Sequence, residues 1–190
     1  MPRGCYTLYD NSIREKQELA AFVYDIPALV QQVKEGQPPR KMQAIVPKSI
    51  LLDANKDPHI AAAKKGTVDD QIATNSRLIE HLHNGTWKHQ KLLVVQTKPP
   101  KFHEGRFNNT NLSSYTKHYS HYFPSKIGQY RLNFNGRVQT PSVKNMQLEN
   151  EQGEILLQFG KVNGQRFHLD YKAPFTAFSA FGAALCQFDM

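Results

Sequence analysis

Short runs of apolar or alternating residues recur along most of the chain and predict strands. They lie at 5–9, 17–25, 40–46, 91–97, 130–138 and 143–149, bounded largely by turn clusters or prolines. A two-residue period is typical of a strand with one buried face, although for 17–25 a short helix fits equally well. Further strands at 155–162 and 166–171 flank Asn163-Gly164, the strongest two-residue hairpin signal in the chain.

The last apolar segment has a helical period and no strongly polar face. Between Lys172 and Asp189 there is no charge, and the large side chains recur at steps of three and four, at Phe175, Phe178, Phe181, Leu185 and Phe188. A helix that is apolar or small all round must be surrounded by protein or lipid. Because the segment is shorter than the roughly 20 residues of a membrane span, we predict a buried core helix at 174–189.

Many strands followed by one buried helix predict a mainly β fold of the α+β type. An antiparallel β-barrel that encloses the C-terminal helix satisfies both features, because closure removes the sheet edges and gives the helix a lining. Helical propensity also occurs at 60–65 and 69–83, and Asn84-Gly85 is a suitable end for the second of these helices.

Length and charge narrow the class of protein further. The 190 residues suffice for a single domain spanning 1–190, in which the polar stretch 106–127 indicates a loop insertion. Lys and Arg number 24 against 16 for Asp and Glu, and the net charge of +8 favours acidic partners such as anionic lipid or nucleic acid. Two cysteines and no apolar leader after Met1 indicate a reducing, cytoplasmic setting.

No residue pattern indicates catalysis. Nucleophile motifs, phosphate-binding loops and dinucleotide-binding glycine patterns do not occur in the sequence. His81 and His83 lack the further ligands of a metal site, and His118 and His121 fit a polar aromatic loop better than a metal site. We therefore expect a protein that is not an enzyme and uses no cofactor or metal.

Two segments closely resemble the signatures of a known family, the Tubby C-terminal domain. Residues 134–147 (FNGRVQTPSVKNMQ) match the first signature and residues 180–189 (AFGAALCQFD) match the second. Other blocks follow the family pattern in the same order, at 5–11, 17–25, 38–47, 156–162 and 167–174. The resemblance covers nearly the whole chain and implies a closed twelve-stranded β-barrel threaded by the C-terminal helix.

The chain departs from this family pattern at its front. Family domains carry further strands before the block matched here by 5–11, among them a Lys-x-Arg strand that supplies much of the phosphoinositide site. Relative to that pattern the barrel is incomplete at the N-terminus. One interpretation is a family fragment that has lost lipid binding, and another is a reduced member whose barrel is completed differently.

The resemblance implies a lipid adaptor. Proteins of this family bind phosphatidylinositol 4,5-bisphosphate through Lys and Arg on the barrel surface, since clustered phosphates attract several cations together. We therefore expect a monomeric protein, peripheral at the cytoplasmic face of the plasma membrane, that links protein cargo to this or a related anionic lipid. A DNA-binding, transcription-related role using a basic groove is the alternative, and nuclear and ciliary locations also fit the family.

Four basic residues are the candidate lipid headgroup ligands. Lys16 holds the place of a family Arg in a Leu-Arg-Gln-Glu-Leu block, and Arg14 lies close to it in sequence. Lys16 keeps the charge of that Arg but loses its bidentate geometry. Arg40 and Lys41, at the start of a predicted strand, form a second candidate pair.

Eight other basic residues are interpreted differently. Arg137 and Lys144 lie within the stronger signature, where fixing a turn or a strand pair is a better explanation than headgroup binding. A diffuse basic set could supplement attraction to a membrane or nucleic acid, although a solvated face is the better interpretation. It consists of Lys64, Lys65, Lys88, Lys91, Lys98 and Lys101.

Overall fold

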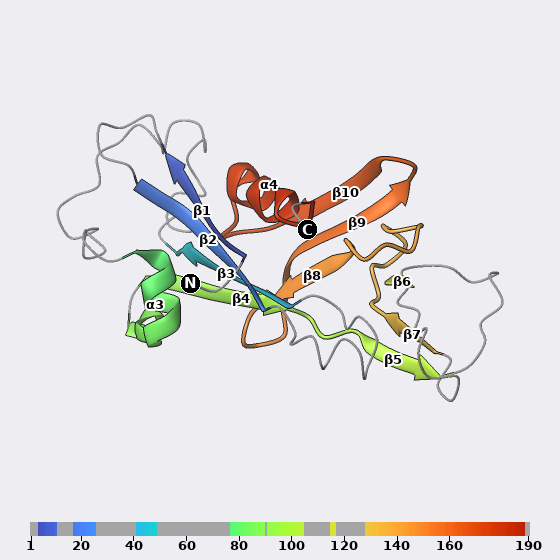
Figure 1. Ribbon diagram of the computed structural model, residues 1–190, viewed down its shortest axis with the longest axis horizontal. Coiled ribbons are helices and arrows are strands. Elements are labelled where there is room, and N and C mark those ends of the chain that lie inside the picture. Colours follow the sequence, from blue (N-terminus) through green and yellow to red (C-terminus); the bar gives the residue numbers. More distant parts are fainter. Residues whose placement is uncertain are drawn as a thin grey trace.

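The fold consists mainly of strands arranged in two antiparallel sheets (Figure 1). The computed structural model describes residues 4–10, 17–25, 41–48, 77–89, 91–104, 115–116 and 128–188. The larger sheet has the order β1-β2-β3-β4-β8-β9-β10 and the smaller sheet has the order β5-β7-β6. The predicted helix at 60–65 and nearly all of the predicted insertion at 106–127 lie outside the described residues.

The strands of the larger sheet are β1 (Cys5–Asp10), β2 (Gln17–Asp25), β3 (Lys41–Pro47), β4 (Leu92–Thr97), β8 (Met146–Glu149), β9 (Ile155–Asn163) and β10 (Arg166–Tyr171). Those of the smaller sheet are β5 (Lys101–Glu104), β6 (Tyr115–Thr116) and β7 (Gly128–Arg131). The helices are α3 (Leu78–Asn84), the short 3-10 helix η3 (Thr86–His89) and α4 (Ala177–Leu185). The open alternative for 17–25 is thus settled in favour of a strand.

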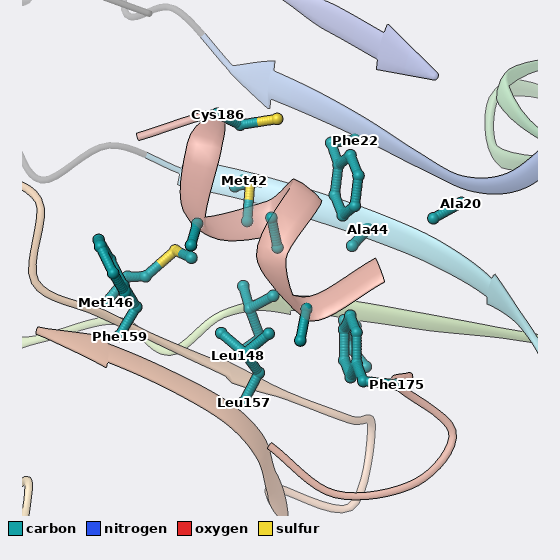
Figure 2. Packing of buried hydrophobic residues seen from close by; sticks show 14 of the residues in the cluster. Ala20, Phe22, Met42, Ala44, Met146, Leu148, Leu157, Phe159, Phe175 and Cys186 are labelled. Carbon is teal, nitrogen blue, oxygen red and sulfur yellow. The ribbon is translucent and has the colours of Figure 1, made fainter. Parts of the chain in front are cut away.

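The C-terminal helix α4 lies in the concave face of the larger sheet and contacts both β2 and β10 (Figure 1). Its sheet-facing side is made of small residues, with Ala180 and Ala183 fully buried. Figure 2 shows the large side chains of this core. They come from both halves of the sheet, β1–β4 and β8–β10; Phe22 lies in β2 and Leu148 in β8. Small residues on the helix let it approach the sheet closely, as dense core packing requires.

The opposite side of α4 corrects the expectation of a helix buried all round. Phe175, just before the helix, is only 4% exposed, but four large residues of the predicted apolar period are about half exposed, namely Phe178, Phe181, Leu185 and Phe188. The larger sheet ends at β1 and β10, so within the described residues no strand closes the sheet over this side. One side of α4 therefore packs on the sheet through small residues. The large apolar residues lie on the other side of the helix, which no described strand covers.

The convex face of the larger sheet carries α3 and η3. A second apolar cluster joins Leu78 of α3 to Ile45 and Leu92 of the sheet, with Trp87 of η3 packed against it. Helix α3 ends at Gly85, whose φ of 68° is the left-handed conformation that glycine adopts readily. The predicted end of this helix at Asn84-Gly85 is therefore confirmed.

The structure shortens two predicted strands. The one at 143–149 is reduced to β8 (Met146–Glu149), and the one at 130–138 keeps only its first residues, in β7. Strand β7 ends at Arg131, because Asn135 and Gly136 both have positive φ, 50° and 78°, and Arg137 N donates to Phe134 O at 3.0 Å. Two consecutive positive φ values form a tight turn that a continuous strand cannot contain. The strand predicted at 130–138 is thus wrong beyond Arg131, whereas the hairpin of β9 and β10 around Asn163 is confirmed by their register.

The irregular segment after this turn packs tightly on β9, and this contact is testable. A Cβ added to Gly160 would overlap both γ-methyl groups of the buried Val138. We expect Gly160→Ala to lower the free energy of unfolding by about 1–3 kcal/mol through overpacking. Urea denaturation of Gly160→Ala, Val138→Ala and the double variant would measure it, and the double variant should lose less than the sum of the two. Strict additivity would contradict the contact.

The two sides of α4 should also differ in stability. Phe175→Ala removes a buried ring and should cost about 3–5 kcal/mol of unfolding free energy. Phe181→Ala removes a ring that is 53% exposed, so we expect a loss of less than about 1 kcal/mol. Urea midpoints of the two variants give the comparison, and equal losses would show that the open side of α4 is covered in solution.

Candidate functional site

In the sequence, the four candidate headgroup ligands form two pairs, one just before β2 and one at the start of β3. Lys41 is exposed at the start of β3, where it pairs in register with Asp25 at the end of β2. Arg14, Lys16 and Arg40 lie outside the described residues, but Lys16 directly precedes Gln17, the first residue of β2. Eight residue steps of a strand separate the two ends of β2, roughly 26 Å. Lys16 therefore directly precedes one end of β2 in the sequence, whereas Lys41 lies beside the other end of that strand.

We call these two regions the Gln17 end and the Lys41 end. At the Gln17 end, β2 begins, β3 ends and β4 begins, and α3 and η3 lie beside them (Figure 1). Glu18 organises this region, because its Oε2 accepts from Leu78 N at 2.6 Å and its Oε1 accepts from Tyr9 OH at 3.2 Å. The first turn of α3 is thereby tied to β2.

Lysines meet at the same end of the sheet. Lys48, just after β3, donates its backbone N–H to the carbonyl of Lys91, just before β4, at 2.7 Å. Lys88 lies in η3, with its Nζ 5.6 Å from the ring centroid of Trp87. All three lysine side chains are exposed. The sequence alone had assigned Lys88 and Lys91 to a diffuse basic set, and had given no role to Lys48.

Cations at the Lys41 end are partly compensated by a carboxylate. Lys98 Nζ lies 3.2 Å from Glu149 Oε2. Beside it, Thr97 Oγ1 accepts from Met42 N at 2.6 Å, which fixes β3 against β4. Lys41 and Lys101 are both exposed.

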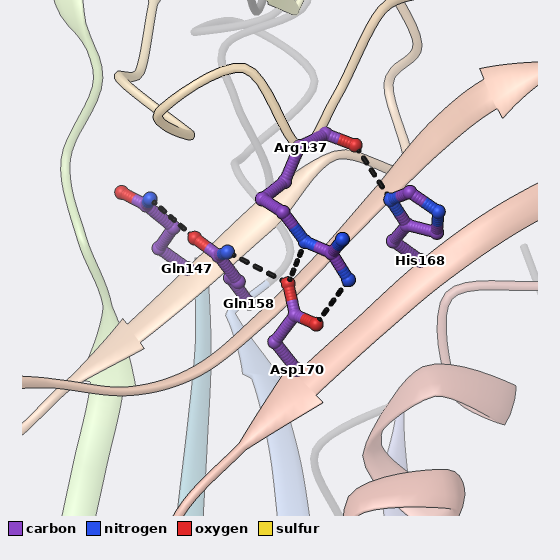
Figure 3. Close-up of polar contacts among 5 residues, drawn as sticks. All are labelled: Arg137, Gln147, Gln158, His168 and Asp170. Carbon is purple, nitrogen blue, oxygen red and sulfur yellow. Dashed lines mark hydrogen bonds and ion pairs between the residues drawn. The ribbon is translucent and has the colours of Figure 1, made fainter.

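The first signature contains an ion pair that explains Arg137. Its Nε and Nη2 donate to the two carboxylate oxygens of Asp170 at 3.0 and 2.6 Å (Figure 3). Gln158 Nε2 also donates to Asp170 Oδ2 at 2.8 Å, and His168 Nδ1 donates to the carbonyl of Arg137 at 2.8 Å. The hydrogen bonds from Arg137 lower the pKa of Asp170, and the same pair raises the pKa of Arg137. The predicted structural role of Arg137 is confirmed.

Lys144 has a structural role as well. Its Nζ donates to the carbonyl of Gln187 at 3.3 Å and lies 5.1 Å from the ring centroid of Phe188. A cation at this point interacts favourably with the carbonyl end of α4 and with the face of an aromatic ring. Gln187 in turn donates from Nε2 to Tyr24 OH at 2.7 Å, so the chain after α4 is anchored to β2.

The buried amides of the first signature satisfy the backbone around them. Asn145 Oδ1 accepts from Lys161 N at 2.8 Å, and Asn145 Nδ2 donates to Thr140 O at 3.0 Å. Gln147 Nε2 donates to Asn133 O at 2.7 Å. Backbone outside a sheet ladder must find such partners when it is buried, so these signature residues determine the fold of the segment.

The described residues contain neither a metal-binding cluster nor a helix that could span a membrane. Within that part of the chain, no three or more His, Cys, Asp or Glu side chains gather in a way that could hold a metal ion. Likewise, none of the helices there combines the length and the apolar character that crossing a membrane requires.

The chain forms a β-rich domain in which a curved antiparallel sheet holds a C-terminal helix in its concave face. Residues of the two sequence signatures form hydrogen bonds that join the helix and the irregular segments to this sheet. The model of the Tub family matches residues 3–190, and the chain belongs to this family. "Tubby-related protein 1" of Mus musculus is 31% identical over 176 residues, which are 92% of this chain and 25% of that protein. "Tubby protein homolog 1" of Caenorhabditis briggsae is 28% identical over an alignment of 194 positions, which covers 96% of this chain and 38% of that protein.

Plant relatives match as well. "Tubby-like F-box protein 11" of Oryza sativa subsp. japonica is 45% identical over an alignment of 106 positions, which covers 51% of this chain and 21% of that protein. The chain thus spans between about a fifth and two fifths of the length of these relatives.

The Arg137–Asp170 pair gives a prediction for pH dependence. A carboxylate whose pKa is lowered in the folded state stabilises the protein above its unfolded pKa, and that contribution is lost as pH falls through the folded pKa. Because the pair is partly exposed, Asp170→Asn should lower the free energy of unfolding by no more than about 1 kcal/mol at pH 7. The difference from the parent should shrink from about pH 4 downward.

Urea unfolding at neutral and acidic pH provides the measurement. Glu151→Gln removes a carboxylate at an exposed turn position and is the matched control. A deficit in Asp170→Asn that persisted unchanged under strongly acidic conditions would contradict an electrostatic origin.

Proposed function

We propose that this protein is a phosphoinositide-binding adaptor of the Tubby type, attached peripherally to the cytoplasmic face of the plasma membrane. Membership of the Tub family, matched over residues 3–190, is the observation that carries the proposal. The net charge of +8 supports it, because each Lys or Arg near an anionic membrane contributes about 1 kcal/mol of attraction. In this role the protein is not an enzyme, and it links protein cargo to phosphatidylinositol 4,5-bisphosphate or a related anionic lipid.

The candidate ligands form two alternative sites. Arg14 and Lys16 adjoin the Gln17 end, and Arg40 and Lys41 adjoin the Lys41 end, so one flat membrane patch meets only one pair closely. We favour the pair at the Gln17 end, because Lys16 stands where the family pattern has a basic ligand. Arg137 is outside both pairs, since its guanidinium is bound to Asp170.

Sedimentation with phosphatidylcholine vesicles, with and without phosphatidylinositol 4,5-bisphosphate, tests the proposal. We expect pelleting that depends on the bisphosphate lipid. Arg14→Gln/Lys16→Gln should weaken the apparent affinity roughly 25-fold, at about 1 kcal/mol for each cation. The matched variant Arg40→Gln/Lys41→Gln removes the same charge at the other end and should weaken it much less.

Each alternative result has a clear meaning. Pelleting that is the same with and without the bisphosphate lipid would overturn the proposal. A larger loss in Arg40→Gln/Lys41→Gln would move the headgroup site to the Lys41 end. Binding to DNA with a steep salt dependence, and none to the vesicles, would favour the nucleic-acid alternative.

A further inference from the structure

The Gln17 end carries a group of cations that the fold assembles from separate segments. Lys48 follows β3, Lys91 precedes β4, and Lys88 lies in η3. The backbone hydrogen bond from Lys48 N to Lys91 O at 2.7 Å sets two of these residues side by side. Helix η3 packs against β4, which brings Lys88 to the same region.

Trp87 gives this end a second property that suits a membrane surface. It is half-buried, packs against the apolar cluster of Leu78 and Leu92, and lies beneath the ammonium group of Lys88. Tryptophan with neighbouring cations is typical of the boundary between lipid headgroups and acyl chains, because the ring is apolar and its N–H is polar. It is also the only tryptophan in the chain.

Three acidic residues lie at this end: Asp10, which ends β1 opposite Gln17, and Glu18 and Glu80, whose carboxylates are engaged beside α3. Glu18 accepts from Leu78 N and from Tyr9 OH, and Glu80 accepts from Arg77 N at 3.4 Å. Both acids therefore lie at the first turn of α3, whereas Lys88 follows its last turn. At the Lys41 end, Lys98 is bound to Glu149. What distinguishes the Gln17 end is Trp87 with the ammonium group of Lys88 above its ring.

We propose that the surface formed by Lys48, Lys88, Lys91 and Trp87 lies flat against an anionic membrane and orients the protein on it. This inference rests on the proposed lipid-binding function and adds to it a docking surface. Gln17 begins β2 at the same end, and the candidate ligand Lys16 directly precedes it in the sequence.

The single tryptophan provides a direct measurement on the full chain. Vesicles of phosphatidylcholine and phosphatidylserine, with and without phosphatidylinositol 4,5-bisphosphate, should shift Trp87 emission to shorter wavelength. Lipids brominated in the acyl chains should quench that emission. Lys48→Gln/Lys88→Gln should weaken the apparent affinity about fivefold for each lysine. The matched control Lys161→Gln/Arg166→Gln removes equal charge from the β9–β10 hairpin and should have a much smaller effect.

The outcomes separate this inference from the proposed function. Bisphosphate-dependent pelleting with no change or quenching of Trp87 emission would overturn the docking surface and leave the lipid-binding function standing. Equal losses in the two double variants would overturn it as well. A Trp87 shift and quenching that occur equally with phosphatidylserine alone would support the docking surface and contradict phosphoinositide specificity. Circular dichroism of both variants checks that each is folded.

Discussion

The structure depends on the contact between α4 and the concave face of the larger sheet. Strands β4 and β8 join the two halves of that sheet through only two residue pairs, Gln96 with Glu149 and Thr97 with Leu148. Helix α4 spans this weak joint, because it contacts β2 in one half and β10 in the other. A Cβ at Gly182 would meet Phe22 Cε2 at 3.4 Å, so a small residue keeps the helix close to β2. Because α4 buries apolar area against both halves of the sheet, the two halves share one hydrophobic core although only two residue pairs join β4 to β8.

The polar contacts of the two signatures reinforce the same junction. Gln187, after α4, reaches back to Tyr24 on β2, while Lys144 fixes the carbonyl end of the helix to the segment before β8. On the other face of the sheet, Arg137 and Asp170 join that segment to β10. These residues stand out in the sequence because they satisfy irregular backbone and position a helix. A strong sequence signature in this protein is thus evidence about folding rather than about a ligand.

The sequence predicted local elements better than it predicted burial. Alternation and the Asn163-Gly164 turn located β9 and β10, and Gly85 correctly ended α3. The strand predicted across 130–138 failed, because the turn at Asn135 follows from backbone conformation that alternation does not report. Periodicity also could not reveal that Phe181 faces the open side of the sheet, since this depends on how many strands surround α4. For the candidate site, sequence proximity paired the cations, but only the antiparallel register of β2 and β3 shows that Gln17 and Lys41 lie at opposite ends of β2.

The open side of α4 and the basic end of the sheet have opposite effects on the association of two chains. Half-exposed Phe178 and Phe181 favour association through apolar contact, whereas a net charge of +8 opposes association of like chains. The two features lie on opposite faces, with α4 on the concave face and η3 with Trp87 on the convex one. A membrane that meets the Gln17 end therefore need not cover α4. We therefore expect the proposed lipid binding and the covering of the apolar face to be separable, with substitutions at Lys88 acting on the first and substitutions at Phe181 on the second.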